Sequence, residues 1–176
     1  MNAEHDARII ADVRSVYQSQ RKLAEGALAQ VSDEEFFQTN SANDNSLAII
    51  VKHVGGNLRS RWTDFLHSDG EKPDRNRDGE FVVDSDTRAT VMKVWEAGFA
   101  ALNAALESLT ANDLGKTVTI RGAPITVTQA MLTNMAHTSH HAGQIVQLAK
   151  QLAGERWQTL SIPRPGGAPA ARNLWK

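Results

Sequence analysis

The 176-residue chain contains no cysteine. It can therefore form neither a disulfide nor an iron–sulfur cluster, and it offers neither a thiolate ligand to zinc nor a nucleophilic sulfur of its own. Long hydrophobic runs are missing too, since no stretch approaches the roughly 18 apolar residues of a membrane span. The chain also has little excess charge: 19 basic and 20 acidic side chains leave a net charge of −1. This balance lacks the basic excess of a nucleic-acid-binding protein.

The first residues, MNAEHDARIIADV, carry acids where a secretory signal peptide has basic residues followed by an apolar stretch. We therefore expect a cytoplasmic protein whose partners are neither membranes nor nucleic acids.

Most of the chain has the apolar spacing of amphipathic helices. The expected long helices cover 3–31, 46–67, the segment from Asp84 or Ser85 to about Leu109, and 126–153. A capping-box pattern, Ser32-Asp33-Glu34-Glu35, predicts a further short helix that carries Phe36 and Phe37. Four long helices in a chain of this length predict an all-α, up-and-down four-helix bundle, with residues 1–176 forming one domain.

Three segments break the helical pattern. Between 116 and 127, β-branched residues alternate on both sides of Arg121-Gly122-Ala123-Pro124, which predicts a small β-hairpin with those four residues as its turn. Residues 68–84 are rich in Asp, Arg and Gly, and their mixed charge favours a solvated connection over a phosphate clamp. Residues 155–176 are expected to form an extended tail over the bundle, held by Trp157, Leu160 and Ile162.

Two adjacent glycines, Gly55 and Gly56, interrupt the second long helix. Each weakens a helix by about 1 kcal/mol relative to alanine. The sequence is compatible with three explanations for these glycines: a close contact between helices, room for a ligand, or neutral sequence change that the helix tolerates.

The six histidines are the main chemical feature of the sequence. His137 and His141 are spaced i, i+4 on the last helix, so both imidazoles can reach one ion. They lie roughly 110° and 70° from the centre of the apolar seam, whereas His140 points roughly 170° away from it, toward solvent. A third ligand has to come from a facing helix, and His53 is the candidate. His5 and His67, near helix ends, are expected to be surface residues.

Spacing alone leaves a second interpretation open, because HxxxH pairs often arise by chance as surface or hydrogen-bonded core histidines. Asn57, Asn134 and Gln144 lie where they could orient an imidazole or a substrate. They are equally compatible with solvated polar positions on the helices.

Several segments resemble one known superfamily. They are the helix-borne His53 within SLAIIVKHVGGNLRSRWTDFLHSDGEKPDRNRDGEF, the distant HTSHHAGQI, and the tail WQTLSIPRPGG. Together they resemble the DinB/YfiT-like superfamily, and within it a small bacterial subfamily of uncharacterised function. The resemblance implies a four-helix bundle with a left-handed twist and unusual connections, often as a homodimer. It also implies a divalent metal held by three histidines, which match His53, His137 and His141, while His140 matches a position that is frequently histidine without being the usual ligand.

Three imidazoles leave coordination positions open, as in catalytic metal sites. Nitrogen ligands suit zinc or nickel, and also iron or manganese. Characterised relatives in the superfamily transfer low-molecular-weight thiols such as bacillithiol or mycothiol, or isomerise related thiol adducts. The resemblance thus implies a metal-dependent enzyme, with thiol transfer as the leading reaction and a small-molecule thiol and an electrophile as substrates. The alternatives are a non-catalytic metal-binding or stress-associated homodimer and a partner-binding scaffold. No catalytic residue is assigned from the sequence.

Overall fold

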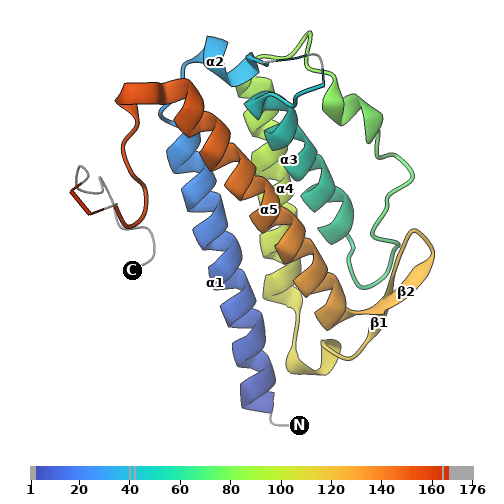
Figure 1. Ribbon diagram of the computed structural model, residues 1–176. Helices are drawn as coiled ribbons and strands as arrows, with labels where there is room; N and C mark the ends of the chain where they lie inside the picture. The colour runs from blue at the N-terminus through green and yellow to red at the C-terminus, as the bar shows by residue number, and fades with distance from the viewer. Residues whose placement is uncertain (1–2, 40, 42, 164, 167–176) are drawn as a thin grey trace.

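Four long helices lie side by side in the computed structural model, which describes residues 3–39, 41, 43–163 and 165–166 (Figure 1). The long helices are α1 (Ala3–Leu28), α3 (Leu47–Trp62), α4 (Arg88–Ser108) and α5 (Val127–Ala153). The shorter elements are α2 (Asp33–Phe37), the 3-10 turns η1 (Asp78–Phe81), η2 (Ala111–Asp113) and η3 (Gly154–Arg156), and the strands β1 (Thr117–Ile120) and β2 (Ala123–Thr126). The predicted all-α bundle with a hairpin before its last helix is confirmed. None of the described helices is long and apolar enough to cross a membrane.

The helix boundaries follow their capping residues. The predicted capping box is present at α2, where the Ser32 side chain accepts a hydrogen bond from the Glu35 amide and the Glu35 carboxylate accepts one from the Ser32 amide. Three boundaries differ from the prediction. The α1 helix ends at Leu28, three residues before its expected end, and the chain turns at 29–30. The α4 helix begins at Arg88 because Thr87 and Thr90 cap each other's amides. The α3 helix ends at Trp62, since Thr63 is extended, and residues 63–67 form turns.

The connection between α3 and α4 runs along the length of the bundle (Figure 1). At one end, Arg88 at the start of α4 donates hydrogen bonds to the carbonyls of Leu28 and Val31, just where α1 finishes. At the other end, Arg14 of α1 pairs with Glu107 near the end of α4. Consequently α1 and α5 run in one direction and α3 and α4 in the other. This long return is the one departure from strict up-and-down alternation.

The two glycines of α3 have separate structural reasons. A Cβ on Gly55 would lie 2.5 Å from the carbonyl oxygen of Val94, and one on Gly98 would lie 2.4 Å from the carbonyl oxygen of Gly55. The backbones of α3 and α4 therefore touch at this crossing. A Cβ on Gly56 would lie 2.3 Å from Oε1 of Glu80, so Gly56 makes room for a side chain from the long connection.

Alanine at Gly55 is expected to lower the free energy of unfolding by about 2–3 kcal/mol, because the backbone of α4 cannot yield as a side chain would. Gly143 in α5 is the matched control, since a Cβ there would meet nothing within 4 Å. Gly143→Ala is expected to raise the stability by up to about 1 kcal/mol through helix propensity. Urea unfolding followed by circular dichroism measures both, and a Gly55→Ala protein as stable as wild type would contradict the close crossing.

The hairpin turn is shorter than predicted. Thr117 pairs with Thr126 and Ile120 pairs with Ala123, which leaves a two-residue turn. Arg121 and Gly122 both have positive φ, 55° and 74°, as a tight hairpin turn requires. Ala123 and Pro124, predicted as turn residues, belong to β2 instead, where proline is tolerated because this two-stranded sheet is all edge.

The tail is held by two of its three expected anchors. Leu160 is buried and Trp157 packs against the core, but Ile162 is 82% exposed, so its predicted role as an anchor is wrong. The chain has left the apolar surface of the bundle by that point. Residues 164 and 167–176 of the expected tail lie outside the described part of the chain.

Candidate metal centre

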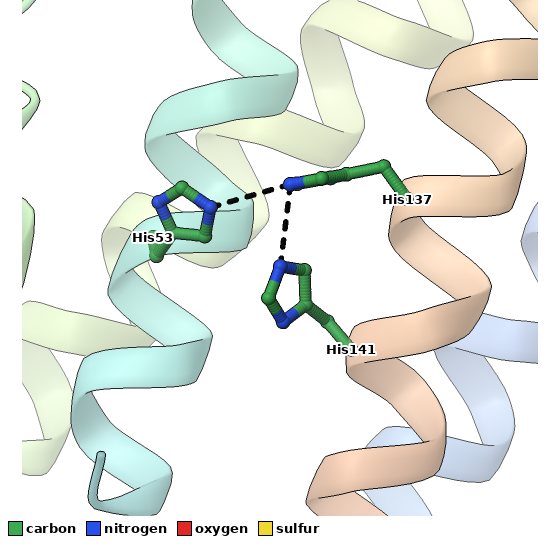
Figure 2. A group of neighbouring side chains, drawn as sticks. All are labelled: His53, His137 and His141. Carbon is green, nitrogen blue, oxygen red and sulfur yellow. Dashed lines mark hydrogen bonds between the residues drawn. The ribbon is translucent and has the colours of Figure 1, made fainter. Parts of the chain in front are cut away.

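Two helices bring three imidazoles together in the middle of the bundle (Figure 2). His53 comes from α3, and His137 and His141 come from successive turns of α5. The Nε2 atom of His137 lies 3.3 Å from that of His53 and 3.2 Å from that of His141. Each histidine offers one nitrogen to a group in which all these atoms lie within 4.8 Å of one another. We call these three residues the triad.

Neighbouring side chains set the tautomers of two triad members. The Nδ1 of His53 lies 2.8 Å from Glu80 Oε2, and the Nδ1 of His141 lies 2.7 Å from Gln144 Oε1. Both acceptors are oxygen atoms, so each Nδ1 carries the proton and donates it. The Nε2 lone pairs of both residues are then free and directed toward His137. An oxygen partner behind the second ring nitrogen is the usual arrangement of metal-ligating imidazoles.

The residues of the triad fit a divalent ion on two grounds. Zinc–nitrogen bonds of about 2.0–2.1 Å in a tetrahedral arrangement place ligand nitrogens about 3.3 Å apart. The two Nε2 separations, 3.3 and 3.2 Å, agree with that value. In addition, His137 Nδ1 is buried without a partner among the described residues. With its proton on this atom, His137 would present a third free lone pair.

Burial keeps His137 and His141 in the neutral state that metal binding needs. Removal from water, followed by the charges of His141 and His53, lowers the pKa of His137 to about 4. Burial also lowers the pKa of His141, against the effect of its hydrogen bond to Gln144. Both imidazoles are therefore unprotonated at neutral pH.

These lowered pKa values predict an acid-sensitive metal-free protein. Between about pH 6.5, the ordinary histidine value, and pH 4 the unfolded chain binds protons that the folded chain does not. Stability therefore falls as the pH is lowered through this window. Urea unfolding of metal-free protein across this range measures the slope, which His137→Ala should reduce. A urea midpoint of wild type that does not change between pH 6.5 and 4.5 would contradict a buried neutral imidazole.

The long connection supplies a side chain that sequence reasoning missed. Glu80 in η1 is buried, and besides its contact with His53 it forms a bidentate ion pair with Arg75 at 2.8 Å for both bonds. Burial alone would raise the pKa of Glu80, but hydrogen bonds from His53 and Arg75 bring it below the usual range. Since Arg75 is also 5% exposed, the prediction of a solvated connection over 68–84 is wrong around these two residues. Six acidic residues occupy that segment, and no periodicity distinguishes Glu80 among them.

The three amides predicted near the triad have different surroundings. Gln144 contacts the triad, with its Oε1 on His141 and its Nε2 3.2 Å from His140. Asn134 donates to Asn57 at 2.8 Å and accepts from Tyr17 and Trp62. These buried bonds join α1, α3 and α5 and involve no imidazole, so Asn57 and Asn134 hold the core together beside the site.

Two further histidines have described side chains, and neither belongs to the triad. His140 is exposed, as the helical angle predicts, and its ring centroid lies 5.4 Å from that of His141. His67 is exposed in the turns after α3. The side chain of His5 lies outside the described residues.

A cavity of about 680 Å³ lies between α5 and the segment that follows α2, and no triad residue belongs to its lining. Its lining includes His140, Gln144 and Ile50, which lies one turn before His53 on α3. Most of the other lining side chains are uncharged amides, and the cavity is linked to the triad through Gln144, whose Oε1 contacts His141.

Comparison with known proteins gives one match. A family described as "Protein of unknown function (DUF1572)" has a model that matches residues 5–166. No curated protein and no solved structure gives a significant match. The matched range contains the whole triad as well as Glu80 and Gln144.

Proposed function

Since the chain belongs to the DUF1572 family, whose description assigns no activity, we propose a function from the site itself: binding of a divalent transition metal by His53, His137 and His141. One observation carries the proposal. Three Nε2 atoms from two helices converge, and oxygen acceptors behind His53 and His141 fix their lone pairs toward the same point. Nitrogen ligands favour zinc or nickel, with iron or manganese also compatible.

We further infer membership of the DinB/YfiT-like superfamily. The bundle, the long connection after the second long helix, and the placement of the histidines on α3 and α5 support this inference. The same resemblance supports a homodimer. The sequence composition supports a location in the cytoplasm.

The proposed activity is metal-dependent thiol transfer. A divalent ion at such a site acts as a Lewis acid that favours the deprotonated state of a water or a thiol. The protein supplies three ligands and leaves other positions open to a substrate. Glu80 and Gln144 hold two imidazoles in orientation, and the cavity that Gln144 links to the triad can admit the substrate. Because the chain has no cysteine, the sulfur must arrive with a low-molecular-weight thiol.

Turnover tests this activity. Zinc- or nickel-loaded protein is mixed with an aryl halide and, in separate reactions, with bacillithiol, mycothiol or cysteine, and thiol consumption is measured. We expect a metal-dependent rate with at least one thiol, which His137→Ala loses and which is kept by His67→Ala, a change at an exposed histidine outside the site. An absence of turnover in metal-loaded wild type, or equal turnover in His137→Ala, would refute the enzymatic proposal while leaving metal binding to be judged by metal content.

Non-catalytic metal binding is the second candidate, and one observation favours it. Among the described residues, the carboxylate that contacts the triad is Glu80, and Arg75 and His53 already occupy both of its oxygens. Its lowered pKa makes it a poor proton donor at neutral pH. Stoichiometric metal without turnover would support this alternative.

A further inference from the structure

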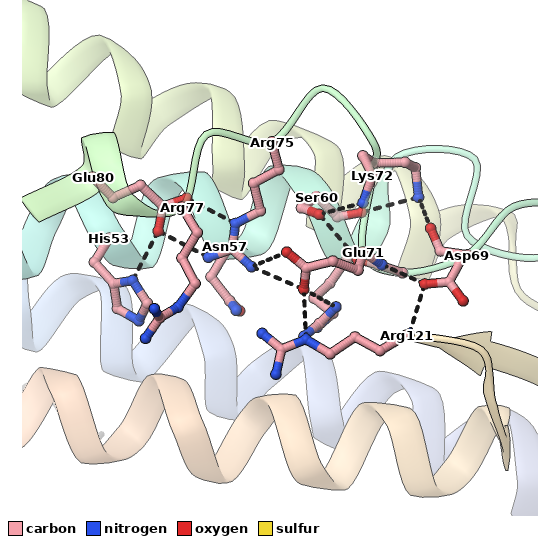
Figure 3. Close-up of polar contacts among 12 residues, drawn as sticks. His53, Asn57, Ser60, Asp69, Glu71, Lys72, Arg75, Arg77, Glu80 and Arg121 are labelled. Carbon is pink, nitrogen blue, oxygen red and sulfur yellow. Dashed lines mark hydrogen bonds and ion pairs between the residues drawn. The ribbon is translucent and has the colours of Figure 1, made fainter.

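A second polar cluster lies along α3 beyond the triad, where three arginines surround Glu71 (Figure 3). Glu71 Oε2 is 3.1 Å from Arg61 Nη1 and 3.2 Å from Arg121 Nε, and Oε1 is 3.2 Å from Arg75 Nη1. Arg61 comes from α3, Arg75 from the long connection and Arg121 from the hairpin turn. Three segments far apart in the sequence therefore place guanidinium groups around one carboxylate.

This cluster holds more positive than negative charge. The charge of Arg75 is already balanced, because Arg75 pairs with the carboxylates of both Glu71 and Glu80. Arg61 and Arg121 are left to share a single oxygen of Glu71. The Arg61 side chain is only 14% exposed. Burial lowers its pKa, Glu71 opposes this, and the charges of Arg75 and Arg121 lower it further. A further anion would relieve this repulsion.

Donor groups are free to receive such an anion. A guanidinium has five N–H groups, and within the described part of the chain Arg61 and Arg121 each direct one side-chain hydrogen bond, to Glu71. The one arginine nitrogen there that is both sealed from solvent and without a partner belongs to Arg14. The unpaired nitrogens of Arg61 are therefore not fully sealed from solvent.

The cluster is close enough to the triad for one small molecule to reach both. His53, Asn57 and Arg61 follow one another at i, i+4 along the same ridge of α3, so the first and last Cα atoms lie about 12 Å apart along the axis. The backbone amides of Arg121 and Gly122 each donate to Asp69 at 2.8 Å, which fixes the hairpin turn beside Glu71.

We propose that Arg61 and Arg121 form a subsite for the carboxylate or phosphate group of a small-molecule substrate whose reacting part lies at the triad. Planar guanidinium groups bind both kinds of anion through paired hydrogen bonds. Arg121 is 61% exposed and can move onto the ligand, while the more buried Arg61 supplies a fixed donor. The proposal rests on the triad being the reactive site, and it assigns an anionic class to the substrate.

Anion binding to the metal-free protein tests the subsite without depending on metal. Succinate and inorganic phosphate are titrated separately at low ionic strength by calorimetry, with the amide NMR signal of Gly122 as a local reporter. Uncharged succinamide is the ligand control. We expect saturable binding of at least one anion and none of succinamide, and the preferred anion identifies carboxylate or phosphate as the natural group.

Arg61→Gln and Arg121→Gln should each weaken the binding at least about tenfold, since each removes a charged hydrogen-bond donor. Arg59→Gln is the matched control, because it removes the same charge from α3 at a side chain that is 66% exposed and whose ion-pair partner among the described residues is Asp74, at 3.8 Å. This control should bind within about twofold of wild type. If Arg61→Gln does not fold, the anion affinity of Arg121→Gln, a change at an exposed side chain, tests the subsite alone.

Two results would overturn the subsite: no saturable binding of either anion to wild type, or equal weakening by Arg59→Gln and Arg121→Gln, which would indicate diffuse charge. Zinc content, measured on the same preparations after loading, reports separately on the triad. Failure of the subsite with normal zinc binding is therefore distinguishable from failure of the metal proposal.

Discussion

Replacing His137 with alanine should reduce the metal affinity by more than about 100-fold, which exceeds the usual effect of losing an outer hydrogen-bond partner of a ligand. His137 is central to the triad, because its Nε2 lies within 3.3 Å of the Nε2 atoms of both other members. Its loss leaves two imidazoles on different helices. Two nitrogen ligands without a third do not form the usual catalytic zinc site.

Elemental analysis after equilibration with zinc or nickel measures this effect. Wild type should carry about one ion per chain, and His137→Ala and the double variant His53→Ala/His137→Ala should carry almost none. His140→Ala is the matched control, because it removes a neighbouring but exposed imidazole and should retain the metal. Full metal content in His137→Ala, or an equal loss in His140→Ala, would contradict the assignment of ligands.

Glu80→Gln should weaken metal binding by about 10- to 100-fold without abolishing it, because the acceptor on His53 Nδ1 loses its charge while keeping its shape. It should also lower the stability of the metal-free protein by about 2 kcal/mol or more, because Arg75 would lose its bidentate partner in a buried setting. Competition with a chromophoric zinc chelator measures the affinity, and urea unfolding measures the stability.

Glu71→Gln separates the two effects of the Glu80 substitution. The substitution removes one negative charge from the same network. Glu71, like Glu80, contacts Arg75, but it contacts no imidazole in the described structure. We expect Glu71→Gln to destabilise the protein while leaving zinc affinity within about threefold of wild type. Equal losses of affinity in both variants would show that Glu80 acts through general stability rather than through His53.

The sequence predicted the parts of the molecule that follow a periodic rule. Apolar spacing located the four long helices, and the i, i+4 spacing placed His137 and His141 on one side of α5, with His140 exposed. His53 was harder, because it lies roughly 130° from its own apolar seam, and only packing against α5 brings it into reach. The convergence of the three imidazoles is thus partly a local property and partly a tertiary one.

The other half of the site depends on contacts without a periodic pattern. Glu80 and Arg75 contact α3 from a segment that contains acidic and basic residues in no regular order. Such a composition is typical of a solvated loop. Gly56 was the available signal, since it leaves the space that Glu80 fills. From the sequence alone, however, that glycine is equally compatible with a helix contact, which is the explanation for its neighbour Gly55.

The connection that returns along the bundle has a thermodynamic consequence. Asp69 near its start holds the hairpin turn, and Glu80 near its end holds His53. Undocking the segment would therefore release a triad ligand from its hydrogen-bond partner, so ion binding and loop docking are linked equilibria. Part of the free energy of ion binding would offset the conformational entropy that is lost when this segment becomes ordered. The bound ion would in turn slow amide exchange over residues 69–80, far beyond the atoms it touches.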